Sequence, residues 1–550
     1  MLGKVLPPFL FAATAVLIAN RLHSLGFVDF RLEYIEQTLT ENLPAGLKPY
    51  FSAIYGEVLP WLGYSSCGWD RAKSFTIISS RVVTPGGTSS AAVEVQDGII
   101  SSVQQIPPSV VGNADKQKQL FGSVLVLDFG DAVVAPGLID VHTHLNEPGR
   151  EDWEGFRSGT SAAAAGGVTL VVDMPLNSFP ATTSSVELQK KKRSAAGKTY
   201  TNVAFWGGLV PDNARDAEAL RSMVAGGVVG FKAFLSPSGI NDFPNSSVAD
   251  IAAALPTLRE LDVPLMVHAE LVDHTPPPGG DAASYATYLG SRQPAWEENA
   301  IAALIGALSS EELGRPPAPA AGSAGGGFGL HIAHLSSARC LPMIQEAKAR
   351  GLPVTVETCP HYLNFAAEDV ARGDTRFKCA PPIRTASNRE ELWGAVAGGD
   401  VDIVSTDHSP APPHMKRMED GDFMAAWGGI SGLQYALPAT WHGMRQRGMK
   451  PSDLARLWST NPAKLLGISG VTGELSPGRR ADITVWHPDR LADTSRAALR
   501  HKHKLTPYED MELYGRVAAT FVNGRLVFDE KRGLYPTACG DLSLRGNSSS

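Results

Sequence analysis

The stretch GLIDVHTHL, residues 137–145, has the apolar pattern of a buried strand and ends in two histidines. Side chains of alternate residues in a strand point to the same side. His142 and His144 therefore face one way and can bind the same metal ion. A lone His-x-His pair is a weak signal, so its meaning depends on what the rest of the chain places beside it.

Seven further apolar runs of the same kind follow, separated by Ala- and Leu-rich segments with a helical pattern. They read TLVVDMPLN, NVAFWGGLV, VVGFKAFLS, PLMVHAEL, GLHIAHLS, PVTVETCPHYL and VDIVSTDHSP. Continuous apolar strands that alternate with helices predict parallel strands buried on both faces. The eight units predict a (β/α)8 TIM barrel over residues 136–469, within the α/β class. Their number argues against the alternative, a doubly wound sheet.

The two flanks of this region have a different pattern. Residues 74–135 and 470–535 contain short β-branched runs such as SFTIISSRVVTPGG and VAATFVNGRLVFDE, separated by Gly, Pro and Asp. Such runs are typical of antiparallel strands joined by turns. We expect both flanks to build one small β-sandwich domain, followed by a C-terminal tail at 536–550.

The N-terminal segment carries the apolar run VLPPFLFAATAVLIAN, residues 5–20, after Lys4. The run is short for a transmembrane helix, which needs about 20 residues, and fits a signal peptide or signal anchor at 1–20. We therefore expect the secretory pathway, with the endoplasmic reticulum as the compartment, and membrane association through this segment stays open. A buried or interfacial helix is the alternative. Residues 21–73 are expected to link it to the folded body.

The composition excludes some classes of protein. The chain has 550 residues, of which 43% are hydrophobic, and a net charge of −7, so no basic stripe supports nucleic-acid binding. Its five cysteines lack CxxC spacing and predict neither a disulfide framework nor a zinc-thiolate site. Buried free thiols are expected, with a Cys67–Cys539 pair left open.

Polar residues at the ends of other predicted strands supply possible partners for the histidine pair. The fourth run ends near Lys232, the fifth in His268, the sixth in His334 and the eighth in Asp407. The carboxyl ends of the strands form the active-site face of such a barrel. Imidazole and carboxylate groups together suit zinc, and also manganese, iron or cobalt. The pattern thus predicts a divalent-metal site at this face.

Lys232 is the unusual member of this group, because a charged lysine on a buried strand is costly. If CO2 carbamylates the amine, it becomes a carboxylate that can bridge two metal ions. The alternative is a lysine whose stem is buried and whose head reaches a surface anion.

The remaining histidines receive structural assignments. His331 lies three residues before His334 and faces the other way, so we expect it to be packed or hydrogen-bonded. His408 adjoins Asp407 and is expected to support its neighbours. His501 and His503, in the basic run RHKHKL, are predicted to be solvated.

Eight segments together carry a family resemblance: HTHLNEPGREDWEGF, MPLNSFP, WGGLVPDN, GINDFP, VETCPHYL, TRFKCAPPIR, STDHSP and WGGISGLQ. The chain resembles the allantoinase family, in the cyclic-amide branch of the amidohydrolase superfamily, over about residues 74–540. It is most similar to the plant-type members, including their hydrophobic leader.

The resemblance implies a metal-dependent hydrolase that opens the hydantoin ring of (S)-allantoin to give allantoate, in purine catabolism. It implies two divalent metal ions, most typically zinc, that activate a water, and Asp407 as the general base. It also implies a homo-oligomer. The implied metal ligands are His142, His144, carbamylated Lys232, His268, His334 and Asp407. The candidate substrate contacts are Asn177, Ser336, Ala380 and Gly429.

Two positions depart from the family pattern. The segment before PPIR often reads Cys-Ser in the family and here reads Cys379-Ala380, which matters only if the serine hydroxyl contacts substrate. Asn146 stands where plant-type members often have an acidic residue, and we expect little effect. Rival functions are a dihydropyrimidinase or hydantoinase, a dihydroorotase, and a non-catalytic assembly homologue. The segments MPLNSFP and WGGISGLQ favour allantoinase.

Overall fold

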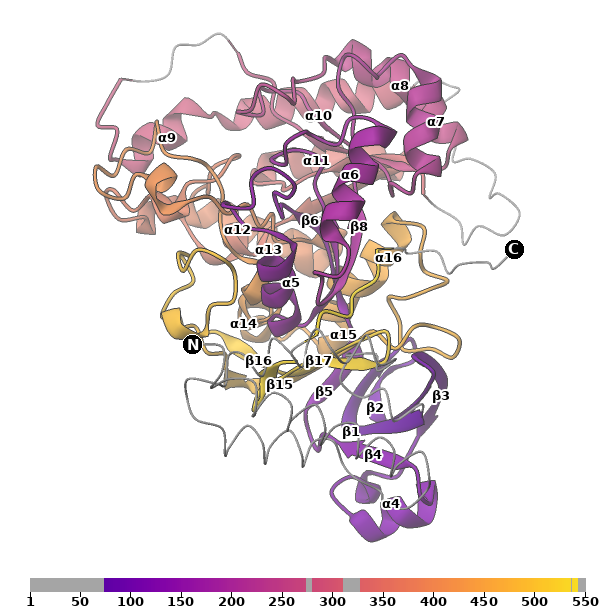
Figure 1. Cartoon of the computed structure of the whole chain (residues 1–550). Coiled ribbons are helices and arrows are strands. Elements are labelled where there is room, and N and C mark those ends of the chain that lie inside the picture. The colour runs from indigo at the N-terminus through magenta and orange to yellow at the C-terminus, as the bar shows by residue number, and fades with distance from the viewer. Residues whose placement is uncertain (1–73, 274–278, 310–326, 536, 543–550) are drawn as a thin grey trace, which may run out of the picture. The chain divides into compact units, whose positions relative to one another are not determined.

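The computed structural model describes residues 74–273, 279–309, 327–535 and 537–542, all within one compact unit, Cys67–Ser550 (Figure 1). The predictions for residues 1–20 and 21–73 lie outside the described residues, as does most of the C-terminal tail. Among the helices that are described, none is long and apolar enough to cross a membrane.

The central part of the chain forms the predicted barrel of parallel strands. The sheets run β6-β7-β8 and β9-β10-β11-β12-β13-β14, and β8 and β9 are one run interrupted at Trp206. A parallel bridge from Thr143 to His408 and a 2.8 Å hydrogen bond from His144 N to His408 O join the first strand to the last. The strands are β6 (Leu138–Thr143), β7 (Val168–Asp173), β8 (Asn202–Phe205), β9 (Gly207–Gly208), β10 (Phe231–Phe234), β11 (Pro264–His268), β12 (Gly329–Ile332), β13 (Val354–Thr358) and β14 (Ile403–Val404).

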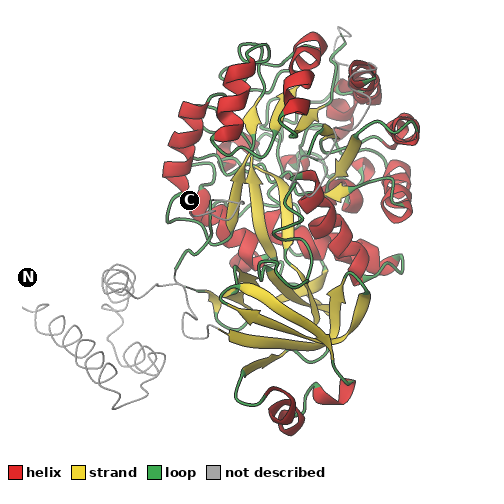
Figure 2. Ribbon diagram, turned by 90° about the vertical axis from the view of Figure 1, so that its right-hand side faces the viewer, coloured by secondary structure: helices red, strands yellow, loops and turns green. Residues whose placement is uncertain are grey.

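Helices separate the barrel strands along the chain and pack around them (Figure 2). They are α5 (Phe156–Ala165), α6 (Ser185–Ala195), α7 (Ala217–Ala225), α8 (Val248–Glu260), α10 (Pro294–Leu308), α11 (Leu341–Ala349), α13 (Ala386–Gly398) and α14 (Ala436–Gln446). Shorter helices lie in the loops: α9 (Tyr285–Ser291), α12 (Pro360–Asn364), α15 (Pro451–Ala455) and α16 (Asn461–Leu465).

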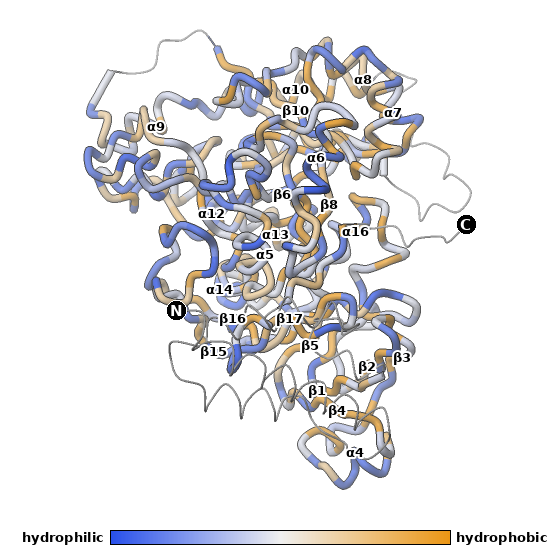
Figure 3. Tube along the Cα trace, viewed as in Figure 1, coloured by the Kyte–Doolittle hydropathy of each residue, from blue (hydrophilic) through white to orange (hydrophobic). Residues whose placement is uncertain are grey.

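The packing of α6 shows why these segments fold as covering helices. Leu188, Lys191 and Ala195 of this helix are buried, and apart from the exposed Val186 most of its other residues are hydrophilic (Figure 3). Ser184 caps its first turn by accepting from the backbone N–H groups of Val186 and Glu187. One narrow stripe therefore faces the barrel, where Lys191 pairs with the buried Asp173, and the other face is left to solvent.

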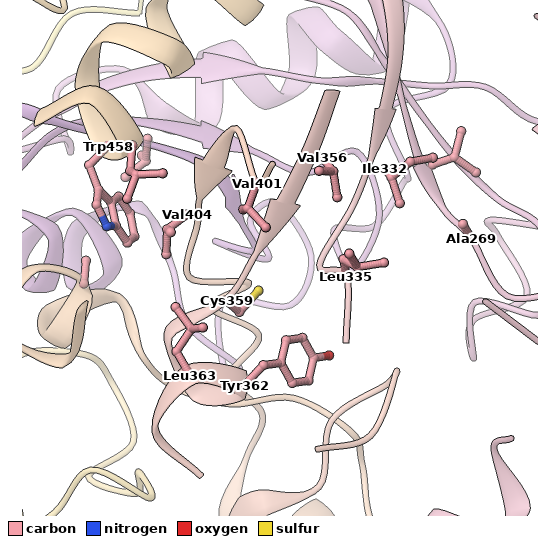
Figure 4. Packing of buried hydrophobic residues seen from close by; sticks show 14 of the residues in the cluster. Ala269, Ile332, Leu335, Val356, Cys359, Tyr362, Leu363, Val401, Val404 and Trp458 are labelled. Atoms are coloured by element: carbon pink, nitrogen blue, oxygen red, sulfur yellow. The ribbon is translucent and has the colours of Figure 1, made fainter. Parts of the chain in front are cut away.

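Apolar side chains fill the space between strands and helices. Ile332, Leu335 and Val356 pack near Tyr362 in one continuous core, which also includes Trp458 (Figure 4). All five are at most 2% exposed. This core fixes the strand ends that carry the polar residues.

The two flanks of the chain build a separate β-rich domain, which confirms the predicted fold class. Its sheet runs β18-β17-β16-β15-β5-β1-β2-β3, with β4 also paired to β1. Phe75 of β1 stacks on Phe521 of β16 at 5.9 Å although three strand pairings separate them, so the sheet folds over its own core. The strands are β1 (Ser74–Thr84), β2 (Gly87–Gln96), β3 (Ile99–Gln105), β4 (Leu125–Asp128), β5 (Val133–Pro136), β15 (Ile483–Leu491), β16 (Tyr514–Val522), β17 (Arg525–Asp529) and β18 (Gly533–Leu534).

One expectation for this domain is wrong. The run that holds β4 and β5 pairs with β1 in parallel, not antiparallel. The physical reason is the connection after β3, which contains the helix α4 (Ala114–Phe121). A connection of this length can carry the chain back to the start of the sheet, whereas antiparallel neighbours need only a tight turn.

The structure also bears on the cysteines. Cys340, Cys359 and Cys379 are buried free thiols, as expected. Cys67 lies outside the described residues, so its pairing stays a prediction.

Candidate active site

Three strand ends bring a compact group of ligand atoms together. His142 on β6, His334 after β12 and Asp407 after β14 each offer one ligand atom, and these atoms lie within 4.8 Å of one another. Asp407 Oδ1 lies 3.3 Å from His142 Nε2 and 3.5 Å from His144 Nε2. All four side chains are buried. The histidine pair therefore does meet further candidate ligands at one place.

His268 and Lys232 lie at the edge of this group. His268 Nδ1 is 2.9 Å from His334 Nε2, which links the fifth strand to the sixth. Lys232 is fully buried, and its Nζ has no hydrogen-bond partner among the described residues. Its ammonium lies 5.2 Å from the ring centroid of Phe234. A buried amine without a partner is a strong indication that another group belongs there.

The protonation states fit a metal centre. Burial lowers the pKa of His144 to about 4, so its imidazole is neutral at pH 7. Burial opposes ionisation of Asp407, but His142 and His144 outweigh it and lower the pKa of that carboxyl to about 2. Burial also lowers the pKa of Lys232 to about 8, against the attraction of Glu357 and Asp407. Metal ligands must be deprotonated, and these groups are in or near that state.

The backbone at two of these positions is strained. His334 has a φ of +36° and Asp407 a φ of +43°. Residues other than glycine in this region cost free energy and cluster at functional sites. The strained backbone therefore marks these two side chains as candidates for a functional role.

Glu357 on β13 supports the cluster, and the sequence reasoning missed it. Its Oε1 lies 2.5 Å from His142 Nδ1 and accepts a 3.1 Å hydrogen bond from the backbone N–H of His334. Its Oε2 lies 3.2 Å from His331 Nε2. The carboxylate thus orients two candidate ligands at once. The sequence does indicate such a role, because a single acidic residue in an apolar run needs a partner when it is buried.

The carboxylate of Glu270 orients His268 in the same way. Its Oε2 lies 2.7 Å from His268 Nε2, and Arg292 pairs with the same carboxylate. Asp140 accepts hydrogen bonds of 3.1 Å from the backbone N–H groups of His142 and Thr406, which ties β6 to the segment after β14. Glu270 and Asp140 lie in the same strand segments as the candidate ligands His268 and His142. Only the folded chain shows which groups these two carboxylates contact.

The predicted substrate contacts lie in different environments. Asn177 Nδ2 is 3.2 Å from His144 Nδ1, and its Oδ1 is buried without a partner among the described residues. Ser336 Oγ donates to Pro382 O at 2.8 Å, and its backbone N–H donates to Glu297. Asn177 therefore has an oxygen free for a ligand, whereas the hydroxyl of Ser336 is engaged within the scaffold.

Ala380 and Gly429 lie on two adjacent segments at the barrel mouth. A Cβ on Gly428 would lie 3.9 Å from the backbone N of Ala380. Gly429 has a φ of +154°, and a Cβ there would lie 2.1 Å from Ser409 O, so no larger residue fits. Its backbone N–H donates to Lys378 O at 2.8 Å. The two segments are thus held together through their backbones.

The other histidines divide into one confirmed and one corrected prediction. His331 is hydrogen-bonded, with its Nδ1 2.8 Å from Thr355 Oγ1. His501 was predicted to be solvated, and this is wrong, because the structure buries it completely. Its ring lies 5.9 Å from that of His408, near Glu154, which accepts from the backbone N–H of Lys502 at 3.0 Å. The local sequence gave no such sign, because the contacts come from distant segments.

Comparison with known proteins agrees with this geometry. The Amidohydrolase family matches residues 133–277 and 318–527, and the family described as allantoinase, composite domain, matches residues 71–132. The chain is thus an amidohydrolase, and its cluster of possible metal ligands lies at the mouth of a barrel joined to a β-rich domain from both flanks. The L-hydantoinase (dihydropyrimidinase) from Arthrobacter aurescens has a similar fold, with a TM-score of 0.75, 26% identity, and coverage of 86% of this chain and 100% of that one.

The curated relatives narrow the class further. The allantoinase of Arabidopsis thaliana is 46% identical over 500 residues, which cover 90% of this chain and 96% of that protein. The allantoinase of Streptomyces avermitilis is 42% identical, covering 83% of this chain and 96% of that protein. The chain belongs to the allantoinase family.

Proposed function

We propose that this chain hydrolyses the ring amide of (S)-allantoin to give allantoate, as a step of purine catabolism. The observation that carries the proposal is the buried group of His142, His334 and Asp407 with the unpartnered amine of Lys232 beside it. The family supports the substrate, since relatives at 40–46% identity are named allantoinases.

The donor set fits a centre of two divalent ions. His142, His144, His268, His334 and Asp407 would hold them, and zinc suits these ligands, as do manganese, cobalt and iron. Bound ions would polarise the ring carbonyl and lower the pKa of a bound water. Lys232 would complete the centre as a carbamate, because burial favours its neutral amine, the form that reacts with CO2.

Asp407 is the candidate general base. Its Oδ1 lies 3.3 Å from His142 Nε2 and 3.5 Å from His144 Nε2, and the carboxyl is ionised at neutral pH. It can therefore accept a proton from the attacking water and deliver it to the leaving ring nitrogen. Such proton transfer typically contributes about 10²–10⁴-fold to the rate. Asn177 Oδ1, buried and unpartnered, can accept from an N–H of the substrate.

A substrate panel tests the proposal. We expect purified protein, loaded with zinc or manganese, to turn over allantoin far faster than dihydrouracil, hydantoin or dihydroorotate. Faster turnover of dihydrouracil or hydantoin would make the chain a hydantoinase, and of dihydroorotate a dihydroorotase. No turnover of any substrate by metal-loaded protein would favour the non-catalytic homologue.

The compartment and assembly are separate proposals. The apolar run at residues 5–20 supports the secretory pathway, with membrane association if the run is retained. We also propose a homo-oligomer, on the family resemblance alone. Fluorescent fusion of the full chain, compared with a chain lacking residues 1–20, tests the first, and light scattering tests the second.

A further inference from the structure

Lys416 is a buried lysine whose amine pairs with no carboxylate among the described residues, and burial lowers its pKa to about 7. It lies in the segment after β14, at the end of the short helix Pro413–Lys416, and is 4% exposed. Its Nζ donates only to backbone carbonyl groups: to Gly429 O at 2.7 Å, to Trp427 O at 3.1 Å and to Lys378 O at 3.4 Å. A buried ammonium is costly, so its retention calls for an explanation.

These three acceptors come from two segments at the barrel mouth. Residues 375–381 contain Lys378 and Ala380, and residues 427–430 contain Gly429. Gly429 is held at both of its backbone polar groups, since its N–H donates to Lys378 O and its carbonyl accepts from Lys416. One ammonium therefore joins the two segments beside the predicted substrate contacts.

The segment that carries Lys416 is itself anchored on both sides. Thr375 Oγ1 donates to the carbonyl of Lys416. The backbone N–H of Trp427 donates to Met415 O at 2.8 Å. The backbone of Lys416 is thus held in place, so its side chain can fix the positions of its acceptors. A lysine on a mobile surface segment could not do this.

The segment that contains Gly429 also contacts the segment that bears Asp407, the candidate general base. Ile430, which follows Gly429, forms a parallel bridge with His408 and accepts a 3.1 Å hydrogen bond from the N–H of Ser409. His408 adjoins Asp407 in the chain. The position of Gly429 is therefore set between the Lys416 ammonium and the segment that bears Asp407.

We propose that Lys416 is a positioning residue, which fixes the backbone around Gly429 and Ala380 so that the mouth of the site presents its polar groups to the substrate. The inference rests on the proposed function. Lys416 touches no candidate metal ligand in the described contacts, so it acts on substrate binding through the backbone that it holds.

The test compares Lys416→Met with wild type, using full-length protein loaded with metal. Methionine keeps the apolar stem and removes every N–H donor. We expect KM for allantoin to rise about tenfold or more with kcat within about threefold, because contacts made equally in ground and transition states change KM alone. Metal content should match that of wild type.

Lys192→Met is the matched control, since Lys192 on α6 also donates to a backbone carbonyl, that of Gly226, on the outer layer of the barrel. We expect its KM to stay within about twofold of wild type. If Lys416→Met does not fold, Lys416→Gln takes its place, with a smaller expected rise in KM, because its shorter side chain keeps two donors and cannot make all three contacts.

Three results would overturn the inference: a wild-type KM in the folded variant, an equal rise in the control, or failure of both Lys416 variants to fold, which would make the lysine a folding residue. Absence of allantoin turnover in the wild type would instead remove the proposed function.

Discussion

Replacing Glu357 with glutamine tests whether the site depends on the carboxylate behind its histidines. Oε1 of Glu357 takes part in two hydrogen bonds, with His142 Nδ1 and with the backbone N–H of His334. In the variant this oxygen belongs to a neutral amide and no longer to a charged carboxylate. Hydrogen bonds to a charged group contribute about 1.5–3 kcal/mol and neutral ones about 0.5–1.5. The substitution should therefore cost about 1 kcal/mol per bond, or about 2 kcal/mol together.

That free energy corresponds to about a 30-fold effect, at about 1.4 kcal/mol per factor of ten. His331 can adapt, because its imidazole can take the tautomer that accepts from the new amide while keeping its contact with Thr355. We thus expect Glu357→Gln to fold, and to lose about 10–100-fold in metal affinity and in kcat/KM.

The assay is a chelator competition for metal affinity, paired with allantoin turnover at saturating metal. Glu298→Gln is the control, because Glu298 pairs with the exposed Arg339 and such surface pairs contribute little. Wild-type metal affinity and turnover in Glu357→Gln would refute the idea that this carboxylate organises the site. An equal loss in the control would point to a general effect on folding.

The other predictions concern single groups. Lys232→Ala should lose metal binding and activity, with partial rescue by short carboxylic acids, and full activity without rescue would exclude the carbamate. Asp407→Asn should lower kcat by about 10²–10⁴-fold in folded protein, and near-wild-type turnover would remove it as the base. Burial, against the attraction of Glu154, lowers the pKa of His501 to about 3, so unfolding takes up a proton between that value and about 6.5. Stability should then fall as the pH drops through this window, by at most about 1.36 kcal/mol per unit, and His501→Gln should flatten the slope; an unchanged slope in urea denaturation would contradict this.

The barrel and the candidate ligand positions could be predicted from the sequence because both follow from local patterns. Apolar runs define the strands, and a polar residue at a strand end has to lie on one face of the barrel. His142, His334 and Asp407 were found in this way, and the structure brings them within 4.8 Å of one another.

What the sequence could not predict depends on contacts between distant segments. His501 looks like part of a solvated basic run, and only the fold places it against His408. The parallel pairing of β4 with β1 depends on how the connection through α4 crosses the sheet, which periodicity does not encode. Lys416 belongs to no sequence motif, and its partners are backbone carbonyl groups, which residue identity does not reveal.

The most direct test of the account measures metal content and allantoin turnover on one preparation. We expect about two divalent ions per chain, turnover that disappears when a chelator removes them, and recovery when zinc, manganese or cobalt is restored. Undiminished allantoin hydrolysis by protein free of metal would contradict it.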